Sequence, residues 1–173
     1  MFEILHPPSI VTDGSVALLG LPVLFVIFTL KGAFIGKVFP TSVFLPGYVI
    51  ASGATYLQIG IITVVVSIGY MVGQFAIFVG SRRYGPLFVT RVPYTTLEPE
   101  STQFERFDNW FDKYGGPSIF VTNFIPWVRG LLTIPAGASS YSMTRYTLHM
   151  GTSTLLYHVL YVGVALAGLH VVS

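Results

Sequence analysis

Charged side chains are absent from long stretches of this chain, and this constrains its fold more than any other feature. No Lys, Arg, Asp or Glu occurs at 38–81, at 114–128 or after Arg145. A helix needs about 20 apolar residues to cross the hydrocarbon core of a bilayer. Of the 173 residues 9% are charged, against about 25% in an average soluble domain, so a soluble fold could not cover its surface. The sequence therefore predicts an all-α integral membrane protein with one membrane domain, 1–173.

Three apolar runs predict transmembrane spans: 16–30, 57–80 and 146–172. The first run is expected to be retained, because no positively charged region precedes it as in a signal peptide. In the second run, small residues recur mainly at spacings of four or seven, one or two helical turns: Gly60, Ser67, Gly69, Gly73 and Gly80. This spacing lets helices approach closely in lipid, so we expect 57–80 to pack centrally.

Two further apolar segments, at about 38–53 and 117–138, are broken by proline and glycine and cannot form straight helices. The breaking residues are Pro40, Pro46, Gly47 and Gly53 in the first, and Pro126, Gly130, Pro135 and Gly137 in the second. Proline inside a helix removes a hydrogen bond and kinks the chain. Irregular backbone is tolerated at membrane depth only inside protein or beside a wet cavity. Both segments are therefore predicted to be re-entrant hairpins.

The two hairpins occupy corresponding places in two halves, each followed by a long apolar helix. They end in similar letters, ASGATYL at 51–57 and AGASSYS at 136–142. Inverted repeats with broken helices are the recurring architecture of secondary transporters, and the breaks mark the binding site. We predict such a pseudo-inverted repeat, with chance similarity of two short segments as the competing explanation.

The connector at 81–116 holds five basic and five acidic residues. Its aromatic residues recur at helical spacing: Phe104, Phe107, Trp110 or Phe111, and Tyr114. This pattern predicts an amphipathic helix, either lying in the membrane interface or packed on its own protein. If each hairpin returns to its starting side, the connector shares a side with the N-terminus, opposite Lys31 and Lys37. The positive-inside bias then predicts a multi-pass cell membrane protein with a cytoplasmic N-terminus.

Three motifs follow one another along the chain: FPTSVFLPGYVIASGA at 39–54, GYMVGQFAIFVGSRRYG at 69–85 and FDKYGGPSIFVTNFIPWVRGLLTIPAGASSYSMTRYTLH at 111–149. In order and spacing they resemble the DedA family, also called the SNARE-associated or VTT-domain family, from about Phe34 to the end of the chain. The third motif is the most specific, with Lys-Tyr-Gly, Phe-x-Pro-x-x-Arg and Ala-Gly in sequence. The resemblance implies two opposed re-entrant hairpins flanked by transmembrane helices.

The resemblance also implies a function. Bacterial members of this family recycle undecaprenyl phosphate across the inner membrane, and eukaryotic relatives scramble phospholipids. We therefore expect a transporter of the flippase or scramblase type that moves a polyprenyl phosphate or phospholipid between leaflets. The family's acids, thought to couple transport to protons, have no counterpart here: Lys37 precedes the first hairpin and Tyr48 follows its Pro-Gly. Asn123 stands where the family has an arginine.

Arg129 is the one charge within a broken apolar segment, and an arginine at mid-bilayer costs about 2.5–3.5 kcal/mol on insertion scales. A guanidinium fork suits phosphate, and helix ends offer unpaired N–H groups to anions. We expect Arg129 to hold a lipid phosphate, with capping of local carbonyls or snorkelling to the interface as the alternative.

Other candidate substrate-binding residues flank Arg129 or lie in the remaining segments: Asn123, Pro126, Pro46, Gly47, Gly137, Arg82, Arg83, Arg145 and Lys37. Thr122 and Thr133 could add neutral donors, although such residues more often satisfy local backbone in lipid. The three further arginines also suit anchoring to anionic head groups at a helix end, and Lys37 fits an interfacial anchor better than a phosphate contact.

Other functional classes find little support. His149, His158 and His170 do not share one helix face, so we expect no metal or haem cofactor, and polar packing or, for His158, a proton-responsive role. No hydrolase motif is present, so an enzyme is not expected. The chain has no cysteine, and its net charge of +2 is too small to indicate nucleic acid. The expected partner is a membrane lipid, and a homo-oligomer is allowed. A small-ion or metabolite transporter or channel, or a non-transporting assembly factor, would suit the same architecture.

Overall fold

The computed structural model describes residues 15–35, 41–85, 87–88, 102–125 and 129–172. Its helices are α1 Ser15–Leu19, α2 Leu21–Gly32, α3 Thr41–Ala51, α4 Tyr56–Tyr84, α5 Thr102–Tyr114, α6 Gly116–Thr122, α7 Thr133–Ala138 and α8 Met143–Val172. No strand occurs within these ranges, so the all-α class expected from the sequence is confirmed for them.

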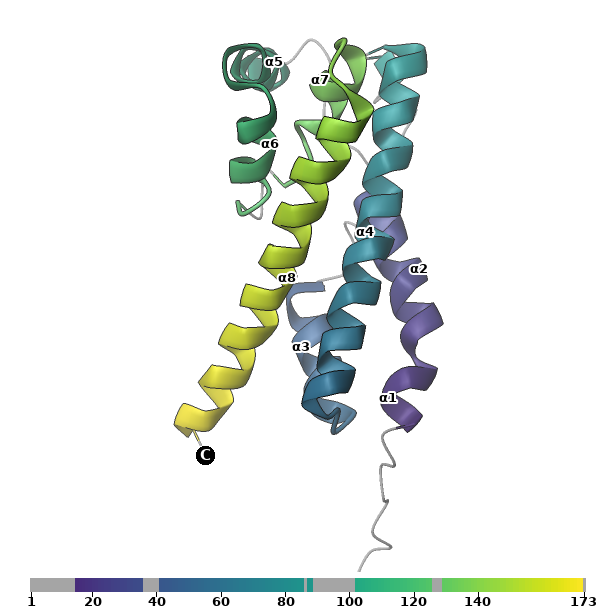
Figure 1. Cartoon of the computed structure of the whole chain (residues 1–173), viewed down its shortest axis with the longest axis vertical. Coiled ribbons are helices and arrows are strands. Elements are labelled where there is room, and N and C mark those ends of the chain that lie inside the picture. Colours follow the sequence, from purple (N-terminus) through teal and green to yellow (C-terminus); the bar gives the residue numbers. More distant parts are fainter. Residues whose placement is uncertain (1–14, 36–40, 86, 89–101, 126–128, 173) are drawn as a thin grey trace, which may run out of the picture.

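Two helices, α4 and α8, are long and apolar enough to cross a bilayer. Their candidate spans are Tyr56–Tyr84, of 29 residues, and Met143–Gly168, of 26 residues. At about 1.5 Å per residue each is about 40 Å long, which exceeds a hydrocarbon core of about 30 Å. They run in opposite directions along the whole length of the molecule (Figure 1). The predicted spans at 57–80 and 146–172 are thus continuous helices.

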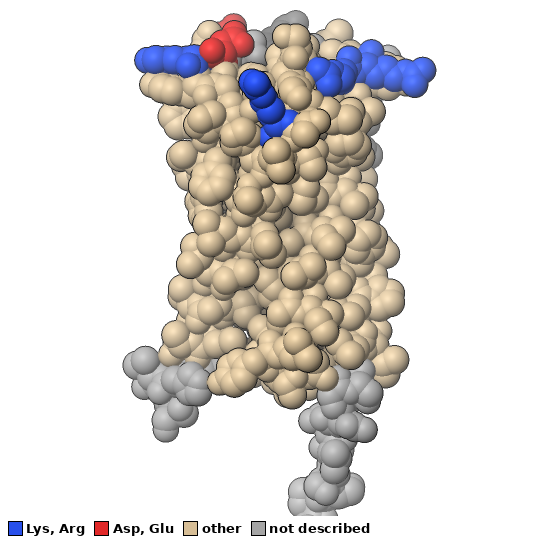
Figure 2. Space-filling view, viewed as in Figure 1, with Lys and Arg blue, Asp and Glu red and all other residues tan. Residues whose placement is uncertain are grey.

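The surface is divided in the way a bilayer requires. In Figure 2 the charged side chains gather at the end of the molecule that carries α5, and the long middle of this face shows none. Large apolar side chains of α4 and α8 stand exposed instead, among them Ile68, Val72, Val159 and Leu160. A soluble monomer rarely exposes a contiguous apolar surface of this extent. The molecule is therefore a membrane protein, with its apolar band facing lipid.

The start and end of α4 are set by local sequence. Thr55 and Gln58 form a reciprocal capping box, in which the Thr55 N–H donates to Gln58 Oε1 at 2.8 Å and the Gln58 N–H donates to Thr55 Oγ1 at 3.4 Å. At the other end Gly85 has a φ of 71°, a left-handed conformation that glycine adopts at little cost. The positive charges of Arg82 and Arg83 lie in the last turn, where they interact favourably with the negative end of the helix dipole.

The helix α2 packs closely against α4 and ends beside its middle. A Cβ at Gly73 would lie 2.1 Å from the Thr29 carbonyl oxygen, and one at Gly32 would lie 2.2 Å from the Tyr70 carbonyl oxygen. Glycine alone lets the two backbones approach this closely. Since α4 contacts α1, α2, α7 and α8, the expectation that 57–80 packs centrally through small residues is confirmed.

The short helices α6 and α7 lie beside the other half of the long pair, near α5 (Figure 1). Gly137 brings α7 against α4, because a Cβ there would lie 2.4 Å from the Phe78 carbonyl oxygen. The Phe78 ring stacks on Tyr146 of α8 with ring centres 4.2 Å apart. Leu132 and Ile119 complete a buried apolar cluster that joins these elements.

Two expectations about the N-terminal half differ from the structure. The run at 16–30 forms α1 and α2, whose apolar part, Ala17–Gly32, is too short to count among the candidate spans. The segment expected to be broken at Pro46 and Gly47 forms the helix α3 with both residues inside it. Proline costs a helix about 3 kcal/mol, but Leu45 and Val49 on α3 are buried in the same core as Leu24 of α2, and this packing holds the helix together.

The side on which the connector lies also differs from expectation. The prediction placed the connector and the N-terminus on one side, whereas α1 begins at the end of the molecule opposite to α5 (Figure 1). That prediction counted 16–30 as a full crossing, whereas α2 stops beside the middle of α4.

The expected amphipathic helix of the connector is present as α5. Phe111 is buried in the protein, whereas Trp110 and Tyr114 are 43% and 49% exposed. The helix therefore packs on its own protein through Phe111. It presents Trp110 and Tyr114 outward at the charged end, which suits an interfacial position.

Candidate functional site

Arg129 lies in the interior, 8% exposed, between the two long helices. Its guanidinium carbon is 4.1 Å from the ring centre of Tyr70 on α4 and 4.0 Å from that of Tyr157 on α8. Both tyrosines are at the middle of their helices. Each cation–π contact contributes about 0.5–2 kcal/mol, so the pair offsets much of the cost of about 2.5–3.5 kcal/mol for an arginine at this depth.

The edge of the guanidinium is held by polar side chains. Arg129 Nε donates to Asn123 Oδ1 at 3.0 Å, and a terminal nitrogen lies 3.5 Å from His158 Nε2. The Asn123 amide donates in turn to the Ser153 hydroxyl at 2.8 Å and the Thr154 hydroxyl at 2.9 Å. These contacts fix the orientation of the Asn123 amide, with its oxygen toward the arginine, and tie the segment after α6 to α8.

The positive charge of this interior has no carboxylate partner in the described part of the chain. In the described part of the chain, the acidic side chains with a known exposure are Glu105 and Asp112, and both are exposed on α5. Lys31, half-buried at the end of α2, lies near enough to Arg129 for the two charges to repel. Two cations in one apolar interior make it attractive to an anion.

A second buried polar cluster supports one wall of the site. Gln74 Nε2 donates to the Gly32 carbonyl at 2.8 Å and to the Tyr70 hydroxyl at 3.3 Å. The Thr133 hydroxyl donates to Gln74 Oε1 and lies 2.9 Å from the Tyr146 hydroxyl. The cluster thereby joins α2, α4, α7 and α8 and orients the Tyr70 ring that covers Arg129.

Gly130 makes the turn that aims Arg129 inward. Its φ is 80°, and a Cβ there would lie 2.3 Å from Gln74 Nε2. The left-handed backbone favours glycine at this position, and a larger residue would also displace the Gln74 side chain.

Of the predicted site residues, the structure brings Arg129 and Asn123 together. Gly137 has the packing role between α7 and α4 described above. Thr122 donates to the Ser118 carbonyl at 2.7 Å, so it satisfies local backbone, whereas Thr133 belongs to the Gln74 cluster.

The other predicted residues do not join this site. Arg82 and Arg83 are exposed, and Arg82, which donates to the Tyr141 carbonyl at 2.9 Å, lies eight residues, about 12 Å, beyond Gln74 along α4. Arg145 is exposed 13 residues, about 20 Å, before His158 along α8.

On α3, Pro46 is half-buried and Gly47 is exposed, and a Cβ at Gly47 would meet nothing within 4 Å. The predicted residues Lys37 and Pro126 lie outside the described ranges.

Sequence reasoning missed the two tyrosines, Gln74 and the position of His158 beside Arg129. A signal for them exists in the spacing of uncharged polar residues within the apolar runs. Ser67, Tyr70 and Gln74 follow one another at three and four residues on α4, which places them on one helix face.

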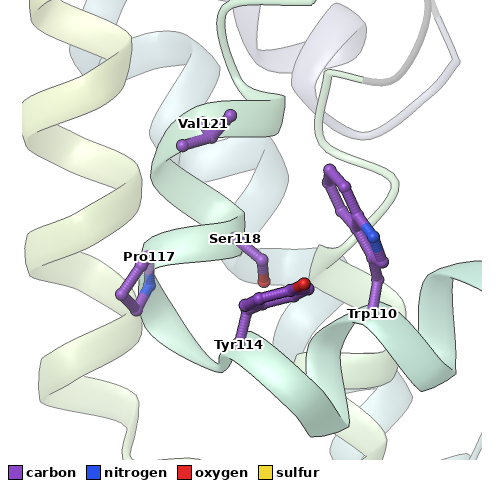
Figure 3. A pocket seen from close by; sticks show the side chains of 5 residues that line it. All are labelled: Trp110, Tyr114, Pro117, Ser118 and Val121. Carbon is purple, nitrogen blue, oxygen red and sulfur yellow. The ribbon is translucent and has the colours of Figure 1, made fainter.

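A shallow apolar hollow of about 180 Å³ lies apart from Arg129, between α5 and α6. Its lining residues are Trp110, Tyr114, Pro117, Ser118 and Val121. In Figure 3 the Trp110 and Tyr114 rings of α5 face the first turns of α6. None of the predicted substrate-binding residues lines it.

Comparison with known proteins finds one matching family. The VTT domain matches residues 39–165, which include α3 through most of α8. No solved structure matches the chain.

Several curated relatives are similar over parts of the chain. Undecaprenyl phosphate transporter A of Staphylococcus aureus is 36% identical over 52 residues, 30% of this chain and 26% of that protein. The protein of the same name from Bacillus subtilis is 26% identical over 131 residues, 73% of this chain and 63% of that protein. An alkaline phosphatase-like protein of Lactococcus lactis is 28% identical over 116 residues, 62% of this chain and 53% of that protein. The chain spans less than two thirds of each of these relatives.

Proposed function

The chain belongs to the VTT-domain family, also known as the DedA family, and on that premise we propose that it moves a lipid-linked phosphate between the leaflets of the cell membrane. Two relatives are named undecaprenyl phosphate transporter A, which favours a polyprenyl phosphate as the substrate, with a phospholipid second. The transport is of the flippase or scramblase type, and the lipid tail stays in hydrocarbon while the phosphate passes Arg129.

The arrangement of short helices supports two re-entrant hairpins. The helix α2 ends beside the middle of α4, and α3 lies in the same half of the molecule (Figure 1). We propose that α2 and α3 are the arms of the first hairpin, which then begins before the predicted 38. The helices α6 and α7 are the arms of the second, in the opposite half. Each hairpin precedes one long helix, as a pseudo-inverted repeat requires.

The observation that carries the proposal is the buried guanidinium of Arg129 without a carboxylate partner in the described residues. Arg129 has five N–H groups, and its partners among those residues are Asn123, His158 and the Tyr70 hydroxyl. The rest remain for a phosphate, whose attraction at 4 Å is about 4 kcal/mol at an effective dielectric constant of about 20. Lys31 adds a second positive charge nearby. An anionic head group would therefore supply the charge that this interior lacks.

We propose transport rather than hydrolysis, although two relatives carry an alkaline phosphatase-like name. The groups around Arg129 are two phenol rings, an amide, hydroxyls and one imidazole. No group of three or more His, Cys, Asp or Glu that could hold a metal ion occurs in the described residues. This arrangement suits binding and release of a phosphate more than attack on it.

The orientation follows from the charged end. The basic residues Arg82, Arg83, Lys113 and Arg145 belong to elements at the end that carries α5. The positive-inside bias places this end in the cytoplasm. Because α1 begins at the opposite end, we propose that Ser15 faces away from the cytoplasm, in place of the cytoplasmic N-terminus expected from the sequence. Reporter fusions before α1 and within the connector test this, and a cytoplasmic signal from the N-terminal fusion contradicts it.

Transport is tested with purified protein in liposomes that contain a fluorescently labelled polyprenyl phosphate, with a membrane-impermeant quencher reporting the outer-leaflet fraction. Loss of a charge-assisted contact is worth about 1.5–3 kcal/mol, so Arg129→Ala should slow transport about 10- to 150-fold. Arg145→Ala removes the same charge from an exposed site and should leave the rate unchanged.

Equal rates for Arg129→Ala and the wild type would refute the role of Arg129. Movement of inorganic phosphate without movement of the lipid would favour the small-ion alternative instead. Size-exclusion chromatography of each variant establishes that it remains folded, and Arg129→Lys, which keeps the charge but loses the planar fork, should retain part of the rate.

A further inference from the structure

His158 is buried, 2% exposed, and its hydrogen bonds define which ring nitrogen carries the proton. The Ser67 hydroxyl donates to the Thr63 carbonyl at 2.7 Å, and its oxygen lies 2.9 Å from His158 Nδ1. Because its own proton is directed to Thr63, the hydroxyl accepts from Nδ1–H. Nε2 is then unprotonated, and its lone pair faces the Arg129 terminal nitrogen at 3.5 Å.

The titratable groups that face or act on His158 among the described residues come from four parts of the chain. Arg129 faces it from the segment between α6 and α7, Lys31 acts on it from the end of α2, and Tyr70 lies edge-on to it from α4. Tyr157 is beside it on α8, with ring centres 5.6 Å apart. The described residues near it include two cations and no carboxylate, so a proton on Nε2 would by itself be a third positive charge in one interior.

An anion at Arg129 would offset the positive charge that disfavours a proton on His158 Nε2. A phosphate placed against the guanidinium edge would attract a proton to the neighbouring Nε2, and would take over the Arg129 N–H that Nε2 now accepts. The protonated Nε2–H would then donate to a phosphate oxygen. The proton comes from the aqueous buffer and binds to the Nε2 lone pair, and no other bond is made or broken.

We propose that His158 takes up a proton when a phosphate binds to Arg129, so that the anion and the proton occupy this site as a linked pair. This rests on the proposed function, because it concerns the same phosphate. It assigns the proton-binding role to an imidazole on α8, at a distance along the chain from both hairpins.

Linkage fixes the sign of the expected effect. A site that gains one proton on binding an anion binds that anion more weakly as pH rises, by up to about tenfold per pH unit. The second ionisation of a phosphate monoester, near pH 6, acts in the opposite direction by adding negative charge to the ligand. The two effects are therefore distinguishable, and the ligand's own titration is common to every variant.

The test measures binding of farnesyl phosphate to the purified chain in detergent between pH 6.5 and 8.5. The wild type should bind several-fold more weakly per pH unit, and His158→Gln should lose this dependence. His149→Gln is the matched control, since His149 is nine residues away, nearer the charged end of α8, and should keep the wild-type slope. His158→Asn, which can still donate to Ser67, replaces the glutamine variant if that variant does not fold.

Calorimetry of the wild type gives a reading that needs no variant, because buffers with different ionisation enthalpies report protons taken up on binding. Net uptake at pH 7.5, where the probe is already mostly a dianion, supports the proposal. Binding without proton uptake, or equal pH slopes in wild type and His158→Gln, overturns it and leaves the phosphate site standing. Absence of farnesyl phosphate binding by the folded wild type overturns the proposed function as well.

Discussion

The contact between α2 and α4 gives a prediction whose size follows from the structure, the effect of Gly73→Ala. The new methyl group would lie 2.1 Å from the Thr29 carbonyl oxygen and 2.6 Å from the Ala33 nitrogen, both backbone atoms of or next to α2. Backbone cannot rotate away as a side chain can, so α2 must shift. Overpacking of this kind costs about 1–3 kcal/mol, and we expect the upper end of this range.

A gain in helix propensity acts against that cost. Alanine is more favourable than glycine inside a helix by about 1 kcal/mol, so the net loss for Gly73→Ala is about 2 kcal/mol. Gly60 provides the matched control on the same helix, because it is exposed and a Cβ there would meet nothing within 4 Å. Gly60→Ala should therefore stabilise the protein by up to about 1 kcal/mol.

The assay is equilibrium unfolding in detergent micelles, followed by circular dichroism for both variants and the wild type. The two alanines should move the transition in opposite directions, with Gly73→Ala unfolding at lower denaturant concentration. If both variants shift the transition in the same direction by the same amount, then α2 does not lie against Gly73, and its position beside the middle of α4 is refuted.

Three further changes probe the interior. Gly130→Ala should cost about 1–2 kcal/mol for its left-handed backbone and displace Gln74 as well. A lower melting temperature would show this, with Gly47→Ala, an exposed helix position that should not lose stability, as the control. Asn123→Leu should cost about 1–3 kcal/mol by leaving buried polar partners unpaired and should also weaken farnesyl phosphate binding; a stability loss with unchanged affinity would contradict its role in orienting Arg129. Tyr157→Leu should remove a cation–π contact with Arg129 and lower the free energy of unfolding by about 0.5–2 kcal/mol. A double-mutant cycle of unfolding free energies with Arg129→Ala should show a coupling energy of that size. Additive effects would show that the Tyr157 ring does not stabilise Arg129.

The class of the protein and its long helices could be predicted from the sequence because the features that determine them lie within single segments. Charge-free runs and helical spacing within 57–80 and 146–172 are properties of single segments, and the aromatic spacing that predicts α5 is local as well. The lone charge of Arg129 in an apolar segment drew attention to the site for the same reason.

The depth of the first apolar run could not be predicted in this way. The run at 16–30 has the composition of a crossing, but α2 is held beside the middle of α4 by a backbone contact between Gly32 and Tyr70. That contact joins residues far apart in the sequence. The predicted side of the N-terminus depends on the same contact, because it was derived by counting crossings.

The partners of Arg129 escaped prediction for a related reason. Tyr70 and Tyr157 precede and follow it by 59 and 28 residues in the chain, and they meet it only because both helices turn these faces inward. Helix rotation depends on packing between segments, which a single sequence does not specify. A charged residue in an apolar segment without an acid nearby indicates that it has polar or aromatic partners, but the sequence does not show which residues these are.

Arg129 contacts two antiparallel helices at their midpoints, so it connects these helices in addition to carrying the positive charge of the site. Its guanidinium links α4 and α8 through the Tyr70 and Tyr157 rings. A phosphate that draws the guanidinium out of the tyrosine sandwich would unfasten the two long helices at the same moment. Binding of the phosphate and loosening of the contact between α4 and α8 would then be coupled.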